Sequence, residues 1–374
     1  MAIDLTKMPK LGFGMMRLPC ENDVIQIDRV CEMVDAYLEA GLNYFDTAYV
    51  YHGGKSETAI REALVKRHNR SDYMIADKLP AWSMKVEADR DKIFNEQLER
   101  LGTDYIDFYL LHSLEDGNNY DTYERLDCFN WGIEKKKEGK IKHFGFSYHG
   151  TPELLNEVLD KHPEIEFVQI QLNYADWNNP VVQSGKLYEI LHERNIPMII
   201  MEPVKGGRLA SLEPEFDAIL KAANPDKSQA SFALRFVASL PGVMTILSGM
   251  SSEDQMKDNL NTFTNFEPLN QTEKEAVDKV VQKMTDLDLV ECTSCRYCCD
   301  GCPSNINIPE IFKALNTIRL YPGDDFRPKN FYQKVTEGAG KASECISCGQ
   351  CESVCPQHLA IPSLMDEVVQ KLES

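Results

Sequence analysis

Two groups of cysteines near the C-terminal end of the chain share one spacing, C-x2-C-x2-C-x3-C-P. Zinc sites usually take their ligands as two separated pairs, whereas four thiols at this spacing before a proline are typical of iron–sulfur cluster binding. The repetition therefore predicts two 4Fe–4S clusters. The eight predicted ligands are Cys292, Cys295, Cys298 and Cys302 in the first group and Cys345, Cys348, Cys351 and Cys355 in the second.

Four polar residues at the ends of apolar runs form a second candidate site. Asp46 ends NYFD, Lys78 ends YMIADK, His112 ends DFYLLH, and Tyr51 follows Asp46 by five positions. A phenol with a pKa of about 10 is a poor acid at neutral pH, but an adjacent ammonium lowers that pKa, and a carboxylate keeps the ammonium charged and in place. A neutral imidazole can donate a hydrogen bond to a substrate oxygen. Together these groups could donate a proton to a substrate oxygen.

The elements that must position these residues alternate between β-rich and amphipathic helical runs. Eight βα units in about 250 residues favour a closed (β/α)8 TIM barrel, an α/β fold, over an open sheet. The ends of its strands would bring Asp46, Tyr51, Lys78 and His112 to one mouth. The strands are expected at 11–18, 43–47, 73–78, 105–112, 142–147, 167–173, 198–202 and 243–248. The helices are expected at 28–39, 57–66, 91–101, 122–137, 152–160, 182–194, 228–239 and 253–263.

The domain organisation follows from where these patterns stop. The barrel is expected over residues 1–265, a linker helix over 266–289 and a cluster-binding domain over 290–374. TEKE at 272–275 has the pattern of a capping box and would open the linker helix. Helical runs between the two cysteine groups predict that the last domain is mainly α-helical.

Charge and the N-terminus exclude two classes of partner. The net charge of −19, without clustered lysine and arginine, argues against nucleic acid. The N-terminus lacks a signal-peptide pattern and no apolar run approaches the length of a membrane span, so we expect a cytoplasmic protein without a membrane partner. In that reducing compartment, clustered cysteines favour metal over disulfides. The oligomeric state is left unknown.

The first 265 residues resemble the aldo/keto reductase family. The stretches that carry the resemblance are DTAYVYHGGKSE (46–57), LGTDYIDFYLLH (101–112), FGFS (144–147), QIQLN (169–173) and EPVKGGRL (202–209). The resemblance implies that Tyr51 is the general acid, that Asp46 and Lys78 tune it, and that His112 orients the substrate carbonyl.

The resemblance also implies a nicotinamide cofactor, NAD(P)H, extended across the barrel mouth. It places the carboxamide at Ser147 and Gln169, and it aligns Met201 with the aromatic residue that the family usually stacks on the nicotinamide. Gly249 and Gln255 align with the lysine and arginine that often bind the 2′-phosphate, so the choice between NADH and NADPH stays open. The residues implied for the phosphates and adenine are Val204, Gly206, Gly207, Arg208, Gly249, Gln255 and Asn259.

Residues 290–374 resemble a two-cluster ferredoxin, in a mainly α-helical form. In such ferredoxins the fourth cysteine of each group serves the other cluster. The resemblance thus implies that Cys355 joins Cys292, Cys295 and Cys298, and that Cys302 joins Cys345, Cys348 and Cys351. Cys299 is then a surplus thiol, and a spacing that uses Cys299 in place of Cys298 stays open.

The two sites handle electrons differently, because a hydride carries two electrons and each cluster normally accepts one. A flavin could connect them and is a possible cofactor, although no flavin motif is visible. We expect an oxidoreductase that reduces an aldehyde, ketone or related unsaturated small molecule, coupled to electron transfer through the clusters, with a redox partner protein as a candidate partner. Loops such as 211–227 would select the substrate. Two alternatives stay open: a catalytically silent barrel scaffold that carries an electron-relay or docking module, and an active reductase whose clusters are only structural.

Overall fold

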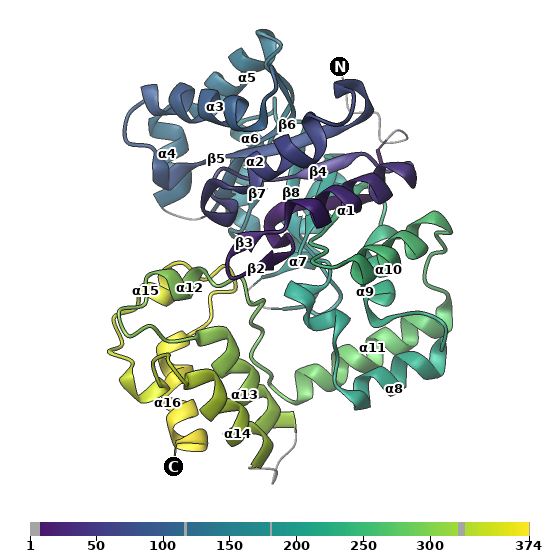
Figure 1. The fold of residues 1–374 in the computed structure, drawn as a ribbon, viewed down its shortest axis with the longest axis vertical. Helices are drawn as coiled ribbons and strands as arrows, with labels where there is room; N and C mark the ends of the chain where they lie inside the picture. The colour runs from purple at the N-terminus through teal and green to yellow at the C-terminus, as the bar shows by residue number, and fades with distance from the viewer. Residues whose placement is uncertain (1–7, 116–117, 180–181, 321–325, 374) are drawn as a thin grey trace. The chain divides into compact units, whose positions relative to one another are not determined.

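The computed structural model describes residues 8–115, 118–179, 182–320 and 326–373 (Figure 1). The chain forms two compact units. Unit 1 comprises Met1–Val204 and Asp226–Asn270, and unit 2 comprises Lys205–Pro225 and Gln271–Ser374. The stretch 205–225 belongs to unit 2, although in the sequence it lies between the two parts of unit 1. The expected boundaries at 265 and 290 had placed this stretch in the barrel.

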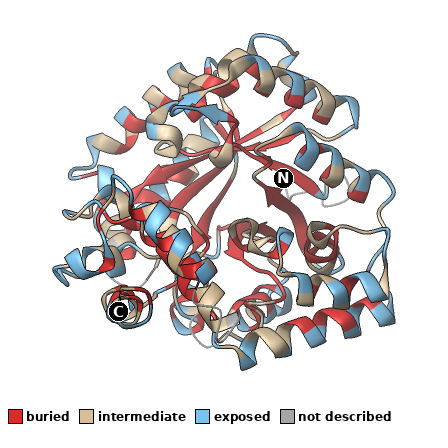
Figure 2. Cartoon of the chain, turned by 60° about the horizontal axis from the view of Figure 1, so that its bottom comes forward, coloured by how far each residue is buried: buried red, intermediate tan, exposed pale blue. Residues whose placement is uncertain are grey.

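Unit 1 is a closed barrel of eight parallel strands, in which each strand pairs with the next and the last pairs with the first. Figure 2 shows these strands as almost entirely buried. The predicted (β/α)8 fold is thereby confirmed. The strands are β1 (Leu11–Gly14), β4 (Tyr44–Asp46), β5 (Met74–Pro80), β6 (Ile106–Leu114), β7 (Ile141–Tyr148), β8 (Phe167–Gln171), β9 (Met198–Met201) and β10 (Val243–Ser248).

Helices cover the outside of the barrel, and a short hairpin, β2 (Cys20–Glu21) with β3 (Val24–Ile25), precedes the first of them. α2 continues into a π-helical turn at Arg61–Val65. The helices are α1 (Ile27–Glu39), α2 (Ser56–Ile60), α3 (Ala88–Leu101), α4 (Asn118–Arg125), α5 (Cys128–Lys137), α6 (Pro152–Lys161), α7 (Ser184–Glu193), α9 (Gln229–Ala238) and α10 (Glu253–Thr264).

Buried apolar residues of the strands form two separate clusters, because successive side chains of a strand point to opposite faces. One cluster lies between strands and helices and includes Phe45, Ile75 and Leu111. The other includes Tyr44, Ala76, Phe108, Phe167 and Ile199. Strands buried on both faces explain why their sequences are continuous apolar runs.

Three expected elements differ from those observed. The helix expected at 122–137 is divided into α4 and α5, because Asp127 adopts a left-handed backbone conformation (φ 50°) that a continuous helix does not allow. The strand expected at 11–18 ends at Gly14 and is followed by a 3-10 turn, Met15–Arg17. The stretch 211–227, expected as a loop, contains helix α8 (Pro214–Ala223).

Unit 2 is mainly helical, as predicted. α8 packs on α11 (Gln271–Asp286), and Lys283 of α11 forms an ion pair with Glu215 of α8 at 2.6 Å. The remaining helices surround a small core that includes Ile311, Phe312 and Val368. These helices are α12 (Tyr297–Asp300), α13 (Ile308–Leu320), α14 (Phe326–Thr336), α15 (Gln350–Ser353) and α16 (Ile361–Leu372).

Among the residues that the structure describes, no helix is both long enough and apolar enough to cross a bilayer.

Candidate active site and cysteine cavities

A buried ion pair lies at the ends of neighbouring strands β4 and β5. The Lys78 ammonium donates hydrogen bonds to Asp46 Oδ1 and to the carbonyl oxygen of Thr47, both at 2.6 Å. Lys78 is fully buried and Asp46 is only 2% exposed. Burial on its own would disfavour both charges, so each of these two groups needs the other. The pair fixes one cation at the barrel mouth.

Tyr51 and His112 lie beside this pair. Tyr51 opens a 3-10 turn, Tyr51–Gly54, and its ring centroid is 4.9 Å from Lys78 Nζ and 6.0 Å from the centroid of the His112 ring. His112 lies on β6, whose register places it opposite Pro80 at the end of β5. The structure therefore brings together the four residues that the sequence nominated.

The acidity of Tyr51 differs from the expectation. The sequence argument had the Lys78 ammonium lower the pKa of this phenol, but burial raises the pKa well above its ordinary value, and the charges of Asp46, Glu202 and Asp77 raise it further. The expected direction was wrong because burial and the charges of three carboxylates together act on the phenol. Tyr51 consequently holds its proton firmly at neutral pH.

His112 is held in its neutral form. Burial, followed by the positive charges of Lys78 and His149, lowers its pKa well below the ordinary value. A neutral imidazole carries one N–H donor and can offer it to a substrate oxygen without bringing a second charge. The ring of Trp82 lies 5.2 Å from the His112 ring and is 54% exposed. Sequence reasoning did not single out Trp82, and its place just after the Lys78 strand was the available signal.

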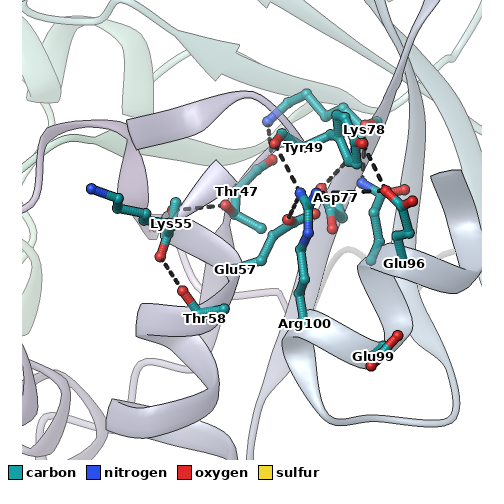
Figure 3. A network of polar contacts seen from close by, with 12 residues as sticks. Thr47, Tyr49, Lys55, Glu57, Thr58, Asp77, Lys78, Glu96, Glu99 and Arg100 are labelled. Atoms are coloured by element: carbon teal, nitrogen blue, oxygen red, sulfur yellow. Dashed lines mark hydrogen bonds and ion pairs between the residues drawn. The ribbon is translucent and has the colours of Figure 1, made fainter. Parts of the chain in front are cut away.

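A second polar network holds the backbone of Lys78 (Figure 3). Asp77 Oδ1 accepts a hydrogen bond from Lys78 N at 2.8 Å, and Gln97 Nε2 donates to the Lys78 carbonyl oxygen at 3.1 Å. Glu57 accepts from Arg100 Nη1 at 2.8 Å. Burial and the neighbouring Glu57 raise the pKa of Asp77 well above its ordinary value. The sequence analysis did not identify this network. Its only signal in the sequence is the presence of acidic residues inside apolar runs.

The residues expected at the nicotinamide carboxamide lie together. Ser147 of β7 is the register partner of Gln169 of β8, and Gln169 Nε2 donates to the Met201 sulfur at 3.5 Å. Ser147 Oγ accepts a hydrogen bond from Ser113 N at 2.7 Å. Gln169 is 2% exposed, and its Oε1 atom has no hydrogen-bond partner among the described residues. A buried acceptor of this kind fits the N–H₂ group of a carboxamide.

The residues expected at the phosphates and adenine belong to both units. In unit 1, Asn259 Nδ2 donates to Ser248 Oγ at 2.6 Å, and Gln255 Oε1 accepts from Ser251 N at 2.7 Å. Val204 and Gly249 also belong to unit 1, whereas Gly206, Gly207 and Arg208 belong to unit 2. Their role in binding a cofactor stays a prediction.

Two cavities in unit 2 are each lined by four cysteines. One is lined by Cys292, Cys295, Cys298 and Cys355, and the other by Cys302, Cys345, Cys348 and Cys351. The fourth cysteine of each group thus lines the cavity of the other group.

Thiols arranged around a hollow fit a 4Fe–4S cluster better than a single ion. Among the described residues, no three cysteine, histidine or acidic side chains are placed to hold one metal ion. Four cysteine sulfurs are the ligand set that such a cluster takes. Cys299 lines neither cavity, and a hydrogen bond with the Cys298 thiol lowers the pKa of Cys299 to about 7.

Comparison with known sequences identifies both parts of the chain. The sequence model of the aldo/keto reductase family matches residues 10–282, and that of a 4Fe-4S dicluster domain matches residues 291–360. L-galactose dehydrogenase of Arabidopsis thaliana is 26% identical over 303 residues, which cover 75% of this chain and 93% of that protein. An uncharacterized oxidoreductase of Bacillus subtilis is 26% identical over 281 residues, which cover 67% of this chain and 86% of that protein.

Solved structures agree with these matches. An aldo-keto reductase of Bacillus halodurans, solved in its holo form, is 26% identical with a TM-score of 0.59, over 73% of this chain and 92% of its own. An aldo/keto reductase of Klebsiella pneumoniae, solved with NADP and acetate, is 22% identical with a TM-score of 0.58 over the same 73% and 92%, and shares the fold. The chain therefore belongs to the aldo/keto reductase family, as an oxidoreductase that also carries a 4Fe-4S dicluster domain.

Proposed function

We propose that the protein reduces the carbonyl group of a small aldehyde or ketone, with Tyr51 as the general acid, and that two 4Fe–4S clusters exchange electrons with this reaction. The observation that carries the proposal is the buried Lys78–Asp46 pair beside Tyr51 and a neutral His112. A nicotinamide dinucleotide supplies the hydride when it is bound.

The roles of the side chains follow from their protonation. The raised pKa of Tyr51 keeps the phenol protonated, as a general acid must be before the reaction starts. Neutral His112 donates a hydrogen bond to the carbonyl oxygen and orients it toward Tyr51. As the hydride adds to the carbon, negative charge develops on this oxygen, and the Tyr51 proton moves to it. Lys78 then faces the phenolate that forms, and Asp46 keeps the ammonium in place.

Residues on β7, β8 and β9 would hold the nicotinamide. Gln169 Oε1 and Ser147 offer hydrogen-bonding groups to the carboxamide, and Met201 offers an apolar surface to the ring. The relative from Klebsiella pneumoniae, solved with NADP, supports this choice of cofactor. We propose the nicotinamide dinucleotide as the hydride donor, and a flavin as the carrier that would pass two electrons one at a time between the hydride reaction and the two clusters.

The two cysteine cavities would hold the clusters with exchanged fourth ligands. Cys348 is exposed and its neighbour Ile346 is 67% exposed, whereas Cys298 is 8% exposed. The cluster of Cys302, Cys345, Cys348 and Cys351 is thus the more accessible to an external redox partner protein. We propose that electrons enter or leave the chain there.

The catalytic proposal is tested with anaerobically purified protein, NADH or NADPH, and a panel of small aldehydes and ketones. Tyr51→Phe should lower kcat by about 10² to 10⁴, the range expected for losing a general acid. Tyr49→Phe is the matched control, because the Tyr49 hydroxyl bonds to Glu96 at 2.7 Å and not to the tetrad. Normal turnover by Tyr51→Phe would refute the assigned mechanism.

The role of the clusters needs a separate test. The clusters are reduced chemically, and their visible absorption is followed after the nicotinamide and carbonyl substrates are added. Reoxidation coupled to product formation supports electron transfer. Turnover without any change in the cluster absorption would show that the clusters are structural.

A further inference from the structure

The segment that follows β9 in the chain contacts the residues around Cys292, within unit 2. Arg208 Nη1 donates a hydrogen bond to the carbonyl oxygen of Val290 at 2.9 Å. Lys205 Nζ lies 3.5 Å from Glu291 Oε2. A short piece of the barrel sequence therefore contacts the two residues that precede the first predicted cluster ligand.

Glycine makes a third contact possible. Gly206 has φ 65°, and a Cβ atom added to it would lie 1.8 Å from the carbonyl oxygen of Thr293. Thr293 is 2% exposed, so its backbone is closely covered. Any side chain at position 206 would force the two backbones apart. Three of the four residues Lys205–Arg208 thus pack on residues on both sides of Cys292.

The contact between Lys205 and Glu291 involves a buried lysine. Lys205 is 1% exposed, and lysine is almost never buried unless it is paired. Glu291 supplies an opposite charge at 3.5 Å. Lys205 is therefore held in a closed environment next to a charge of opposite sign, which keeps this segment close to Cys292.

The Arg208 guanidinium lies beside the chain that carries Cys292. Its Nη1 atom donates to the carbonyl oxygen of Val290, two residues before that cysteine. Ser294 N donates to the Cys292 sulfur at 3.4 Å. Nearby positive charge and N–H donors stabilise electron-rich sulfur, and a 4Fe–4S cluster gains one negative charge when it is reduced.

We propose that Arg208 is a positioning residue that raises the reduction potential of the cluster held by Cys292, Cys295, Cys298 and Cys355. Through Arg208, the chain segment that leaves β9 sets how readily that cluster accepts an electron. The proposal rests on the cluster assignment made above and does not depend on the carbonyl reaction.

The test is a redox titration of the full chain with both clusters, followed by electron paramagnetic resonance and without nucleotide or substrate. Arg208→Gln should lower one midpoint potential so that the ratio of reduced to oxidised cluster falls about tenfold, or about 59 mV for one electron. The second midpoint should stay in place as an internal reference. Arg208→Lys keeps the charge and should remain near the parent value.

Two further variants keep the test decisive. Glu291→Gln removes a negative charge next to Cys292 and should raise the same midpoint, even if Arg208→Gln loses its iron. Lys283→Gln is the matched control, since it removes a cation of unit 2 that pairs with Glu215 and should change neither midpoint. Unchanged midpoints in Arg208→Gln, equal shifts of both clusters, or a fall in Glu291→Gln would overturn the proposal. A protein that fails to reduce carbonyls but shows these shifts would refute the proposed function and leave this inference standing.

Discussion

Asp46→Asn gives the sharpest test of the buried pair at the barrel mouth. The substitution keeps the shape of the side chain and removes its charge, which leaves the fully buried Lys78 ammonium without its ion-pair partner. Removing one partner of a buried ion pair costs about 3–5 kcal/mol. The Thr47 carbonyl and the new amide oxygen still accept from Lys78, so we expect the lower end, about 3 kcal/mol of unfolding free energy.

A double-variant cycle separates the loss of the ion pair from other effects of each substitution on stability. Urea unfolding at pH 7.5, followed by circular dichroism, is compared for Asp46→Asn, Lys78→Met and the double variant, all with the parent iron content. Neutral replacement of both partners of a buried pair is often close to neutral in stability. The double variant should therefore recover at least half of the loss in Asp46→Asn. A loss below about 1 kcal/mol in the single variant, or no recovery in the double, would refute the reasoning.

Three further predictions concern buried titratable groups and the surplus thiol. Asp77 has a raised pKa, so the folded protein loses stability as the pH rises above about 4, where the carboxyl of the unfolded chain ionises. In thermal unfolding, Asp77→Asn should be more stable than the parent at pH 8, and the difference should be smaller at pH 5. His112 has a lowered pKa, so stability is present above about pH 6.5 and is lost as the pH falls, because only the unfolded chain then binds the proton. His112→Gln should lose about 2 kcal/mol less than the parent between pH 7 and pH 5, and equal losses would contradict the assignment. Cys299→Ala should keep about eight iron atoms per chain and Cys298→Ala should lose iron, by metal analysis; the reverse result would favour the alternative spacing.

Much of the barrel was predictable because its strands are buried on both faces. Short continuous apolar runs such as the one before His112, alternating with amphipathic helical runs, favour buried parallel strands. The end of each run then fixed where a polar side chain would reach the barrel mouth. Asp46, Lys78 and His112 could be placed in this way from residue type and position alone.

The remaining features depend on contacts that a linear pattern does not contain. The direction of the Tyr51 pKa shift results from the sum of burial and three carboxylates, of which Glu202 is far away in the sequence. The carboxyl pair of Asp77 and Glu57 joins β5 to α2 and was invisible for the same reason. Likewise, Lys205–Pro225 has the composition of a barrel loop, and only its long-range packing shows that it belongs to unit 2.

The exchange of the fourth cysteines has a consequence for the unfolded chain. A cluster bound by Cys292 and Cys355 closes a loop of about 60 residues, and in the chain-entropy description a single covalent link of that length removes on the order of 4 kcal/mol of freedom from the unfolded state. The second cluster, bound by Cys302 and Cys345, closes a loop inside the first. In the proposed arrangement the two loops are nested, so loss of the inner cluster would release chain that the outer cluster still encloses, whereas loss of the outer cluster would release chain on both sides of the inner loop. On this proposal, the small helical core of unit 2 would depend on both clusters for its resistance to unfolding.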